Sequence, residues 1–429
     1  MNIVELAKIA KKTSINLAAC DTETKNNALK SIAEALEKRK SEIFDANNKD
    51  IEAGEKSNLA LPLLKRLKFD DNKLNEVIAG INSLISLPDP VGETLWCKEL
   101  DEDLELYKVS CPIGVIGVIF ESRPDALVQI SSLCLKSGNA ALLKGGSEAL
   151  NTNKILTEII VEASTNAGIP SGWVHLLESR DDVTGMLRLD KYIDLLIPRG
   201  SNEFVQYIMN NSTIPVMGHA DGICHCYVDS DADIQMAVNI VTDSKTQYVS
   251  VCNATETLLV HKDIAKTYLP LLKNELDKKN VTIVGCEDTN KIINVDLATE
   301  DDWKTEYLDY KLSIKIVNSL EEAIDHINTY GSGHTDAIIT KNEANAKTFM
   351  ELVDSGNVFW NCSTRFSDGF RYGFGAEVGI STNKVHARGP VGLDGLLIYK
   401  YKLIGHGNIV ADYSNNVRTF KHKMIDKKF

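Results

Sequence analysis

The sequence lacks the long apolar run that a membrane-spanning helix requires. Its longest near-apolar stretch, residues 111–120, is about half as long as the roughly 20 residues such a helix needs. Residues 1–12 are amphipathic and contain no apolar core of the signal-peptide type. The nine cysteines are scattered without a repeating framework, which argues against a disulfide-stapled secreted domain. We therefore expect a cytoplasmic protein.

Excess positive charge is also missing, because the formal net charge is -13. Nucleic acids and anionic membranes bind clustered lysine and arginine, so neither partner is expected. An anionic small molecule is still allowed, since a phosphate or carboxylate pocket can be built locally from a few cations and backbone amides. A length of 429 residues predicts two or three domains.

The dinucleotide fingerprint GxGxxG is absent, so an ordinary pyrophosphate site is not indicated. What is present is a βαβ pattern: an apolar strand at 114–120, a helix at 125–136 and a second strand at 140–143. Its ligand-binding end would lie at residues 121–124 and 144–147. A solvated lysine at the end of a strand is the plain alternative for Lys144.

The rest of the chain alternates between helical and strand patterns. Residues 1–80 predict helices, and residues around 97–112 predict an exposed hairpin, because polar and apolar side chains alternate there. Residues 226–229 are expected to close the first half as a strand. In the tail, residues 397–401 predict a strand that could join a partner's sheet.

The most informative single residue is Cys252, which lies between two apolar runs in the stretch 247–261. A thiol beside backbone amides can have a lowered pKa and an oxyanion site, which suits a nucleophile. Free cysteines are more often small buried hydrophobic residues. The residues around Cys252 alone leave both interpretations open.

Residues 219–226 (HADGICHC) look at first like metal ligands. No CxxC pair or second ligand pair accompanies them. In a strand, Cys224 and Cys226 would also share one face while His225 points away. We therefore expect no metal site.

Together these blocks resemble the aldehyde dehydrogenase superfamily over nearly the whole chain. The matching pieces are PIGVIGVIF (112–120), SGNAALLKGG (137–146), RGS (199–201), Cys252 and TEYL (305–308). Two longer runs, residues 317–338 and 375–390, are similar to the branch of that superfamily that reduces an acyl phosphate of glutamate.

The resemblance implies an α/β, aldehyde dehydrogenase-like fold: a Rossmann-type cofactor domain, an α/β catalytic domain and a small β element for oligomerisation. Residues 1–226 would form the NADP-binding domain, with the hairpin at about 97–112 contributing to oligomerisation. Residues 227–385 would form the catalytic domain that carries Cys252. Residues 386–429 would form a C-terminal oligomerisation segment.

The same resemblance implies that Cys252 attacks the acyl phosphate of L-glutamyl 5-phosphate and forms a thioester. Hydride from NADPH would then give L-glutamate 5-semialdehyde, a step of proline biosynthesis. Ser122 stands where the superfamily has an oxyanion-stabilising asparagine. The glutamate that activates water in other members would fall at residues 218–219, where there is no carboxylate. The thioester would then be reduced rather than hydrolysed.

For the cofactor, Lys144 matches the lysine at the adenosine ribose. Ser147 replaces an acid common in NAD-preferring members, and a hydroxyl there can donate to a 2′-phosphate that a carboxylate would repel. Glu306 matches the glutamate at the nicotinamide ribose, and Gly200 and Ser201 would lie beside that ring. These matches favour NADPH.

Substrate contacts need arginine forks and polar donors, because the substrate carries a carboxylate and a phosphate. The candidates are Arg123, Arg199, His219, His334, Arg365 and Arg388, and each could equally be structural. A homo-oligomer is expected, and glutamate 5-kinase would supply the acyl phosphate.

Two alternatives are left open. A CoA-acylating aldehyde dehydrogenase also needs no water-activating base. A binding protein could have kept the fold and lost the chemistry, and its Cys252 would then react no faster than its other thiols.

Overall fold

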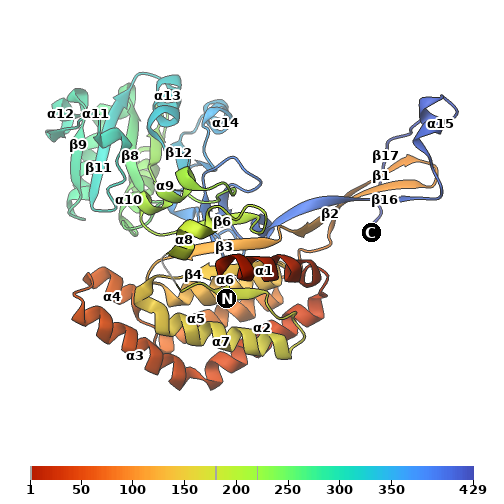
Figure 1. Cartoon of the computed structure of the whole chain (residues 1–429). Coiled ribbons are helices and arrows are strands. Elements are labelled where there is room, and N and C mark those ends of the chain that lie inside the picture. The colour runs from red at the N-terminus through yellow and green to blue at the C-terminus, as the bar shows by residue number, and fades with distance from the viewer. Residues whose placement is uncertain (1, 179–180, 220) are drawn as a thin grey trace.

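The computed structural model describes residues 2–178, 181–219 and 221–429. Figure 1 shows a body built around two sheets, from which a long β arm projects. Among the described residues, no helix combines the length and the apolar character that crossing a membrane requires.

The first sheet has four parallel strands in the order β5-β4-β3-β6. The strands are β3 (Val115–Phe120), β4 (Ala140–Lys144), β5 (Val174–Leu176) and β6 (Leu195–Arg199). β3 is buried throughout because both of its faces are covered. Ile116 and Val118 pack into one core, and Val115 and Ile119 pack into the other. The predicted βαβ unit is confirmed.

Helices cover both faces of this sheet. Residues of α2, α5, α6 and α7 share the core on one face, and residues of α1, α8 and α9 share the core on the other. The helices of this half are α1 (Ile3–Leu17), α2 (Thr22–Lys38), α3 (Lys40–Lys56), α4 (Leu61–Leu67), α5 (Asp71–Ser86), α6 (Pro124–Lys136), α7 (Leu150–Asn166), α8 (Asp181–Met186) and α9 (Asn202–Asn211).

The second sheet has seven parallel strands in the order β10-β9-β11-β8-β7-β12-β13. Its strands are β7 (Cys224–Val228), β8 (Thr255–His261), β9 (Thr282–Gly285), β10 (Asp296–Leu297), β11 (Lys311–Val317), β12 (Thr335–Ile339) and β13 (Asn357–Trp360). Its helices are α10 (Ile234–Thr246), α11 (Lys262–Asp277), α12 (Glu287–Ile293), α13 (Leu320–Tyr330) and α14 (Glu343–Leu352). Residues of α10, α11 and α12 share one core with the sheet, and residues of α13 and α14 share the other.

The strand expected to close the first half is placed differently. β7 pairs with β8 and β12 in the middle of the second sheet. The assignment of residues 226–229 to the first half was therefore wrong. The local pattern gave no sign of this, because a strand covered on both faces looks alike in either sheet.

The arm is a four-stranded antiparallel sheet in the order β16-β2-β1-β17. Its elements are β1 (Thr94–Asp101), β2 (Leu104–Pro112), β16 (Leu397–Gly405), α15 (Val410–Ser414) and β17 (Lys423–Ile425). The predicted hairpin is confirmed. The tail strand β16 runs along β2 of the same chain (Figure 1), so it completes its own hairpin sheet.

The short hairpin β14 (Gly379–Ser381) and β15 (Gly389–Val391) leads to the arm. Although it follows the second sheet in the chain, Val378 and Val391 pack into the core of the first half. The late segment therefore ties the two halves together.

A buried carboxylate from α3 caps α7. The residue before α7, Ala149, offers no side-chain cap. Asp50 supplies it from a distance: its carboxylate accepts from the backbone N–H of Thr152 at 2.8 Å, the Thr152 hydroxyl at 2.6 Å and the Asn151 side-chain amide at 2.8 Å. A negative charge at this helix end also matches the helix dipole.

Replacing Asp50 with alanine is expected to lower the free energy of unfolding by about 2–4 kcal/mol, because several buried donors lose their acceptor. Urea denaturation followed by circular dichroism measures this loss. Asp45→Ala, an exposed carboxylate on the same helix, is the control and should change stability by less than about 0.5 kcal/mol. Equal midpoints for the two variants would contradict the capping role.

Candidate active site

Three loops bring Cys252 together with two histidines. Cys252 precedes β8, His219 precedes β7, and His334 directly precedes β12. Since β8, β7 and β12 are parallel neighbours, the segments before them meet at one edge of the sheet. The Cys252 sulfur and one ring nitrogen of each histidine all lie within 4.8 Å of one another.

The two imidazoles are edge to face, with ring centroids 4.9 Å apart. His219 Nδ1 lies 2.9 Å from the Ile380 carbonyl oxygen. A carbonyl only accepts, so this nitrogen carries the proton and Nε2 has the lone pair. Burial lowers the pKa of both rings, that of His334 furthest. Both imidazoles are therefore neutral at pH 7. Neither ring carries a positive charge with which it could bind phosphate.

Cys252 is a neutral thiol in this structure. Burial, together with the nearby Glu306 and Glu377 charges, raises its pKa to about 12, although the Arg199 charge lowers it. The Cys252 backbone amide lowers this pKa, as expected, but desolvation outweighs it and the net shift is upward. Activation therefore requires a change in the surroundings of the sulfur when ligands bind.

The loop before β7 packs directly on this residue. A Cβ atom at position 222 would lie 2.5 Å from Cys252 Cα and 2.6 Å from its Cβ, so only glycine fits. The Cys224 thiol donates to the Cys252 carbonyl at 3.2 Å. These contacts fix the backbone of the nucleophile on both sides.

Glu306 is held by a residue that the sequence analysis did not select. The side-chain amide of Asn202, the first residue of α9, donates to Glu306 at 2.7 Å and to Asp221 at 2.8 Å. Burial raises the pKa of Glu306, and the bond from Asn202 counteracts this. An asparagine opening a helix after RGS was the only sequence signal for this role.

A buried ion pair anchors the loop that carries Glu306. Lys245 and Glu256 are both fully buried and lie 2.6 Å apart. Glu256 also accepts from the backbone N–H of Leu308 at 3.2 Å, and Leu308 has a φ of 54°. Burial raises the pKa of Glu256 to about 7. The strained backbone at Leu308 is thus held by a charge from β8.

The four candidate arginines are divided by the structure. The guanidinium of Arg199 donates to the Val378 carbonyl and acts electrostatically on Cys252. Arg365 donates to Gln247 at 2.9 Å and is also close enough to Cys252 to interact with its charge. The Arg388 guanidinium donates hydrogen bonds to Asp354 and to the Thr382 carbonyl, and Arg123 forms an ion pair with Asp125. Arg199 and Arg365 therefore act on Cys252 directly, and Arg123 lies close enough to Arg199 to lower its pKa.

Ser122 is buried, with a φ of 37°, and its hydroxyl donates to Glu148 at 2.5 Å. The backbone N–H of Ser122 bonds the same carboxylate at 2.8 Å. The expected oxyanion role of this hydroxyl would require the bond to Glu148 to break. The structure gives Ser122 a clear second role, which is to shape the turn after β3.

The carboxyl ends of β4 and β6 fit a dinucleotide. Lys144 ends β4 with its ammonium group on the Gly145 carbonyl, and Ser147 is exposed beside it. Gly200 follows β6, where a Cβ would come within 3.0 Å of both Glu121 and Phe204. A lysine and an exposed hydroxyl suit a ribose 2′-phosphate, and the absent side chain at 200 lets Glu121 and Phe204 pack directly against the backbone after β6.

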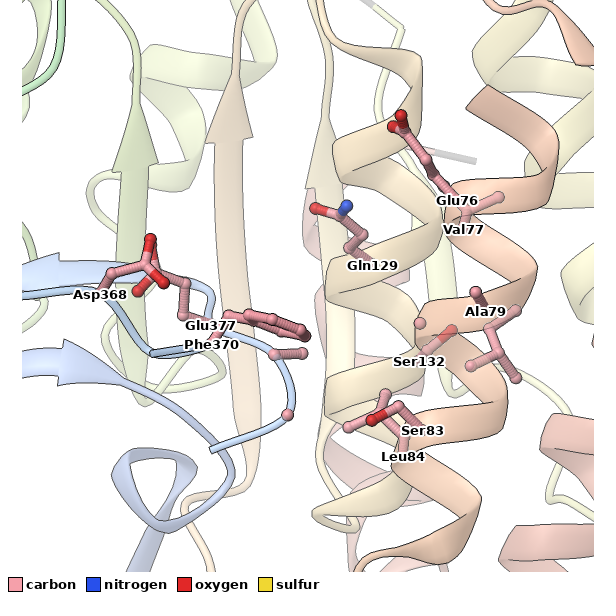
Figure 2. A pocket seen from close by; sticks show the side chains of 14 residues that line it. Glu76, Val77, Ala79, Ser83, Leu84, Gln129, Ser132, Asp368, Phe370 and Glu377 are labelled. Carbon is pink, nitrogen blue, oxygen red and sulfur yellow. The ribbon is translucent and has the colours of Figure 1, made fainter. Parts of the chain in front are cut away.

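A cavity of about 310 Å³ lies between α5, α6 and the loop 368–377. Figure 2 shows Phe370 projecting from this loop toward α6, with Asp368 and Glu377 behind it. Glu377 accepts from the Gly369 backbone N–H at 2.7 Å, and its charge acts on both Arg199 and Cys252. The cavity therefore borders the surroundings of the thiol.

Two carboxylates, Glu306 and Glu377, lie within electrostatic reach of Cys252. The water-activating glutamate is missing at residues 218–219, but other carboxylates lie near the sulfur. Glu377 could have been found in the sequence as the one acid in the GAEVGIS match, but only the fold places it beside the thiol.

Glu306→Gln is expected to lower the pKa of Cys252, because it removes the neighbouring negative charge. Each unit of pKa changes the thiolate fraction tenfold at pH below the pKa, so alkylation at pH 8 should quicken by roughly three- to tenfold. The wild-type rate should keep rising from pH 7 to pH 10 without a plateau. Iodoacetamide labelling, read on the Cys252 peptide by mass spectrometry, measures both.

The matched control is Glu343→Gln, an exposed glutamate on α14, which should leave the rate unchanged. A wild-type plateau near pH 8, or equal rates in the two variants, would contradict this account of the thiol.

The chain is similar to known proteins over its full length. The model of the aldehyde dehydrogenase family matches residues 1–290. A gamma-glutamyl phosphate reductase from Acetivibrio thermocellus is 70% identical over 429 residues, which is 100% of each chain. One from Methanococcoides burtonii is 54% identical, over 98% of this chain and 96% of its own.

Solved structures also include a gamma-glutamyl phosphate reductase that is similar to this chain. The crystal structure of gamma-glutamyl phosphate reductase from Thermotoga maritima has a TM-score of 0.93 and 44% identity, and the match covers 95% of this chain and 100% of that one. An acetylating aldehyde dehydrogenase from Geobacillus thermoglucosidasius has a TM-score of 0.65 and 16% identity, over 95% and 97% of the chains. The latter likeness concerns the fold alone.

Proposed function

The chain belongs to the aldehyde dehydrogenase family and, within it, to the gamma-glutamyl phosphate reductases. On that premise we propose that it reduces L-glutamyl 5-phosphate to L-glutamate 5-semialdehyde with NADPH, releasing phosphate, as a step of proline biosynthesis. The observation that carries the proposal is the half-buried thiol of Cys252 at the edge where β7, β8 and β12 begin.

The first step forms a carbon–sulfur bond. The Cys252 thiolate attacks the acyl carbon, and the bond from that carbon to the phosphate oxygen breaks, so phosphate leaves and a thioester remains. Arg199 supports the thiolate, because its charge lowers the pKa of Cys252. The Cys252 backbone N–H can donate a hydrogen bond to the oxyanion of the tetrahedral intermediate that precedes the thioester.

The second step is the reduction. NADPH, when bound, supplies a hydride to the thioester carbon. In this proposal Lys144 and Ser147 hold the adenosine ribose and its 2′-phosphate, and Glu306 holds the nicotinamide ribose beside Gly200 and Ser201. The Cys252 sulfur then leaves as the semialdehyde forms, and it regains its proton.

Hydrolysis of the thioester is suppressed because the base that activates water is missing. Glu306 accepts from Asn202, and Glu377 accepts from the Gly369 backbone. No carboxylate stands at residues 218–219, where other members have the glutamate that activates water. His219 and His334 lie close enough to the sulfur to contact the departing phosphate.

Substrate recognition is proposed for the side of the site away from β4. Arg365 and Arg199 offer positive charge for the anionic groups, while Asp368 and Glu377 border the cavity of Figure 2 and suit the substrate ammonium. Arg388 and Arg123 are given structural roles, because their partners are Asp354 and Asp125.

The wider organisation is also a proposal. We assign the residues before β7 to cofactor binding, those from β7 to 385 to catalysis, and 386–429 to oligomerisation, together with the hairpin at 97–112. The expected boundary at 226 thus moves to the start of β7, which belongs to the second sheet. Homo-oligomer formation is supported by large apolar side chains exposed along the arm: Leu95, Ile398, Tyr399, Tyr401, Leu403 and Ile404. All nine cysteines are free, which suits a cytoplasmic location. Glutamate 5-kinase would supply the labile substrate.

The activity is tested in reverse, with glutamate semialdehyde and NADP⁺. Reduction of NADP⁺ should require phosphate, because an acceptor must take the acyl group from the sulfur. Cys252→Ala should lose at least about a thousandfold in kcat, while Cys20→Ala, a half-buried thiol before α2, should not. Turnover that needs CoA instead of phosphate would identify a CoA-acylating enzyme and refute the proposal.

Ser147→Asp is expected to raise the KM for NADP⁺ by at least about tenfold, since a carboxylate repels the 2′-phosphate. The KM for NAD⁺ should change little, because NAD⁺ has no phosphate there. Steady-state kinetics with both cofactors measure the ratio. Ser57→Asp adds the same charge on an exposed site after α3 and should leave the ratio unchanged; an equal shift would point to net charge rather than local contact.

A further inference from the structure

We propose that His219, Cys252 and His334 form a three-ligand site for Zn²⁺, and that Zn²⁺ bound there blocks the nucleophile reversibly. The sequence analysis expected no metal, because it considered only the local run 219–226. The structure keeps His219 from that run and joins it to residues from two other loops.

The distances allow a metal with a small closure. The three ligand atoms lie within 4.8 Å of one another. Zn²⁺ binds nitrogen at about 2.0–2.1 Å and sulfur at about 2.3 Å, which places tetrahedral ligand atoms roughly 3.5 Å apart. Movement of about 1 Å is therefore enough, and side-chain rotation of His219 and Cys252, which are only half-buried, can supply it.

Each imidazole has a lone pair ready for a metal. The Ile380 carbonyl fixes the proton of His219 on Nδ1, which leaves Nε2 unprotonated. His334 Nδ1 lies 2.8 Å from the Thr335 hydroxyl, and its Nε2 is fully buried without a hydrogen-bond partner among the described residues. A metal-binding histidine commonly bonds a backbone carbonyl or similar group through its second nitrogen.

The donor set selects the class of cation. Two imidazoles and a thiolate suit Zn²⁺ and other borderline-soft ions, whereas Mg²⁺ and Ca²⁺ require oxygen ligands. Glu306 and Glu377 contribute negative charge at the sulfur, and Arg199 contributes the opposing positive charge. With three protein ligands, a fourth position stays open to water.

Binding of Zn²⁺ occupies the sulfur of Cys252. The cation forms a bond to the sulfur, the thiol proton goes to solvent, and no electrons change hands. The sulfur can then neither attack an acyl phosphate nor be alkylated until a chelator removes the cation. The metal site rests on geometry alone, while its inhibitory effect rests on the proposed function.

The test uses Co²⁺ as a coloured probe and needs no turnover. Wild-type protein titrated with Co²⁺ should show thiolate-to-cobalt absorption in the near ultraviolet and reach a plateau at one equivalent. Cys252→Ser should lose this band, and His334→Gln and His219→Gln should bind roughly 100-fold more weakly. Cys20→Ser and His406→Gln, which change a thiol and an exposed imidazole elsewhere, should titrate like the wild type.

A second measurement avoids variants that fail to fold. Zn²⁺ should protect Cys252 of the wild type from iodoacetamide and inhibit turnover, and EDTA should reverse both effects. An absent charge-transfer band, or unchanged affinity in Cys252→Ser, would overturn the site. Metal binding and protection in a protein that does not turn over semialdehyde would support the site and refute the proposed function instead. Turnover that saturating Zn²⁺ leaves unchanged would overturn the inhibition.

Discussion

The parallel pairing of β8, β7 and β12 is the constraint on which the rest of the site depends. Backbone hydrogen bonds set the register, with Cys224 opposite Thr255 and His225 opposite Asp336. The loops before these strands are thereby brought to one edge. Close-packed cores on both faces of the sheet keep that edge rigid, so the sulfur of Cys252 has a defined position before any ligand arrives.

The environment at this edge keeps the thiol protonated. Desolvation and two carboxylates raise its pKa, and Arg199 and the Cys252 backbone N–H oppose them only in part. A reactive thiolate is therefore costly until substrate and cofactor change the local charge. The protein gains protection from this arrangement, since an unliganded enzyme with a neutral thiol is slow to react with oxidants or alkylating agents.

The site also depends on contacts between the two halves. Arg199 ends β6 of the first sheet and bonds the Val378 carbonyl of the late segment, while Asn202 at the start of α9 bonds Glu306. Cofactor-binding and catalytic groups are thus connected by hydrogen bonds as well as by proximity. Glu377 lies between this site and the cavity that α5 and α6 border.

The sequence by itself determined the fold class, the βαβ unit, the hairpin and the family, and it selected Cys252 as the proposed nucleophile, because apolar periodicity and short motifs are local properties. It misplaced β7, gave no sign that Arg388 pairs with Asp354, and did not select Asn202 or Glu377. Only the tertiary structure decided which charges meet the sulfur and that His334 joins His219 beside Cys252. The physical reason is that the pKa of a buried group, and the residues that can share a ligand with it, depend on neighbours in space. The order of the strands in the sheet brings these neighbours together from distant parts of the chain.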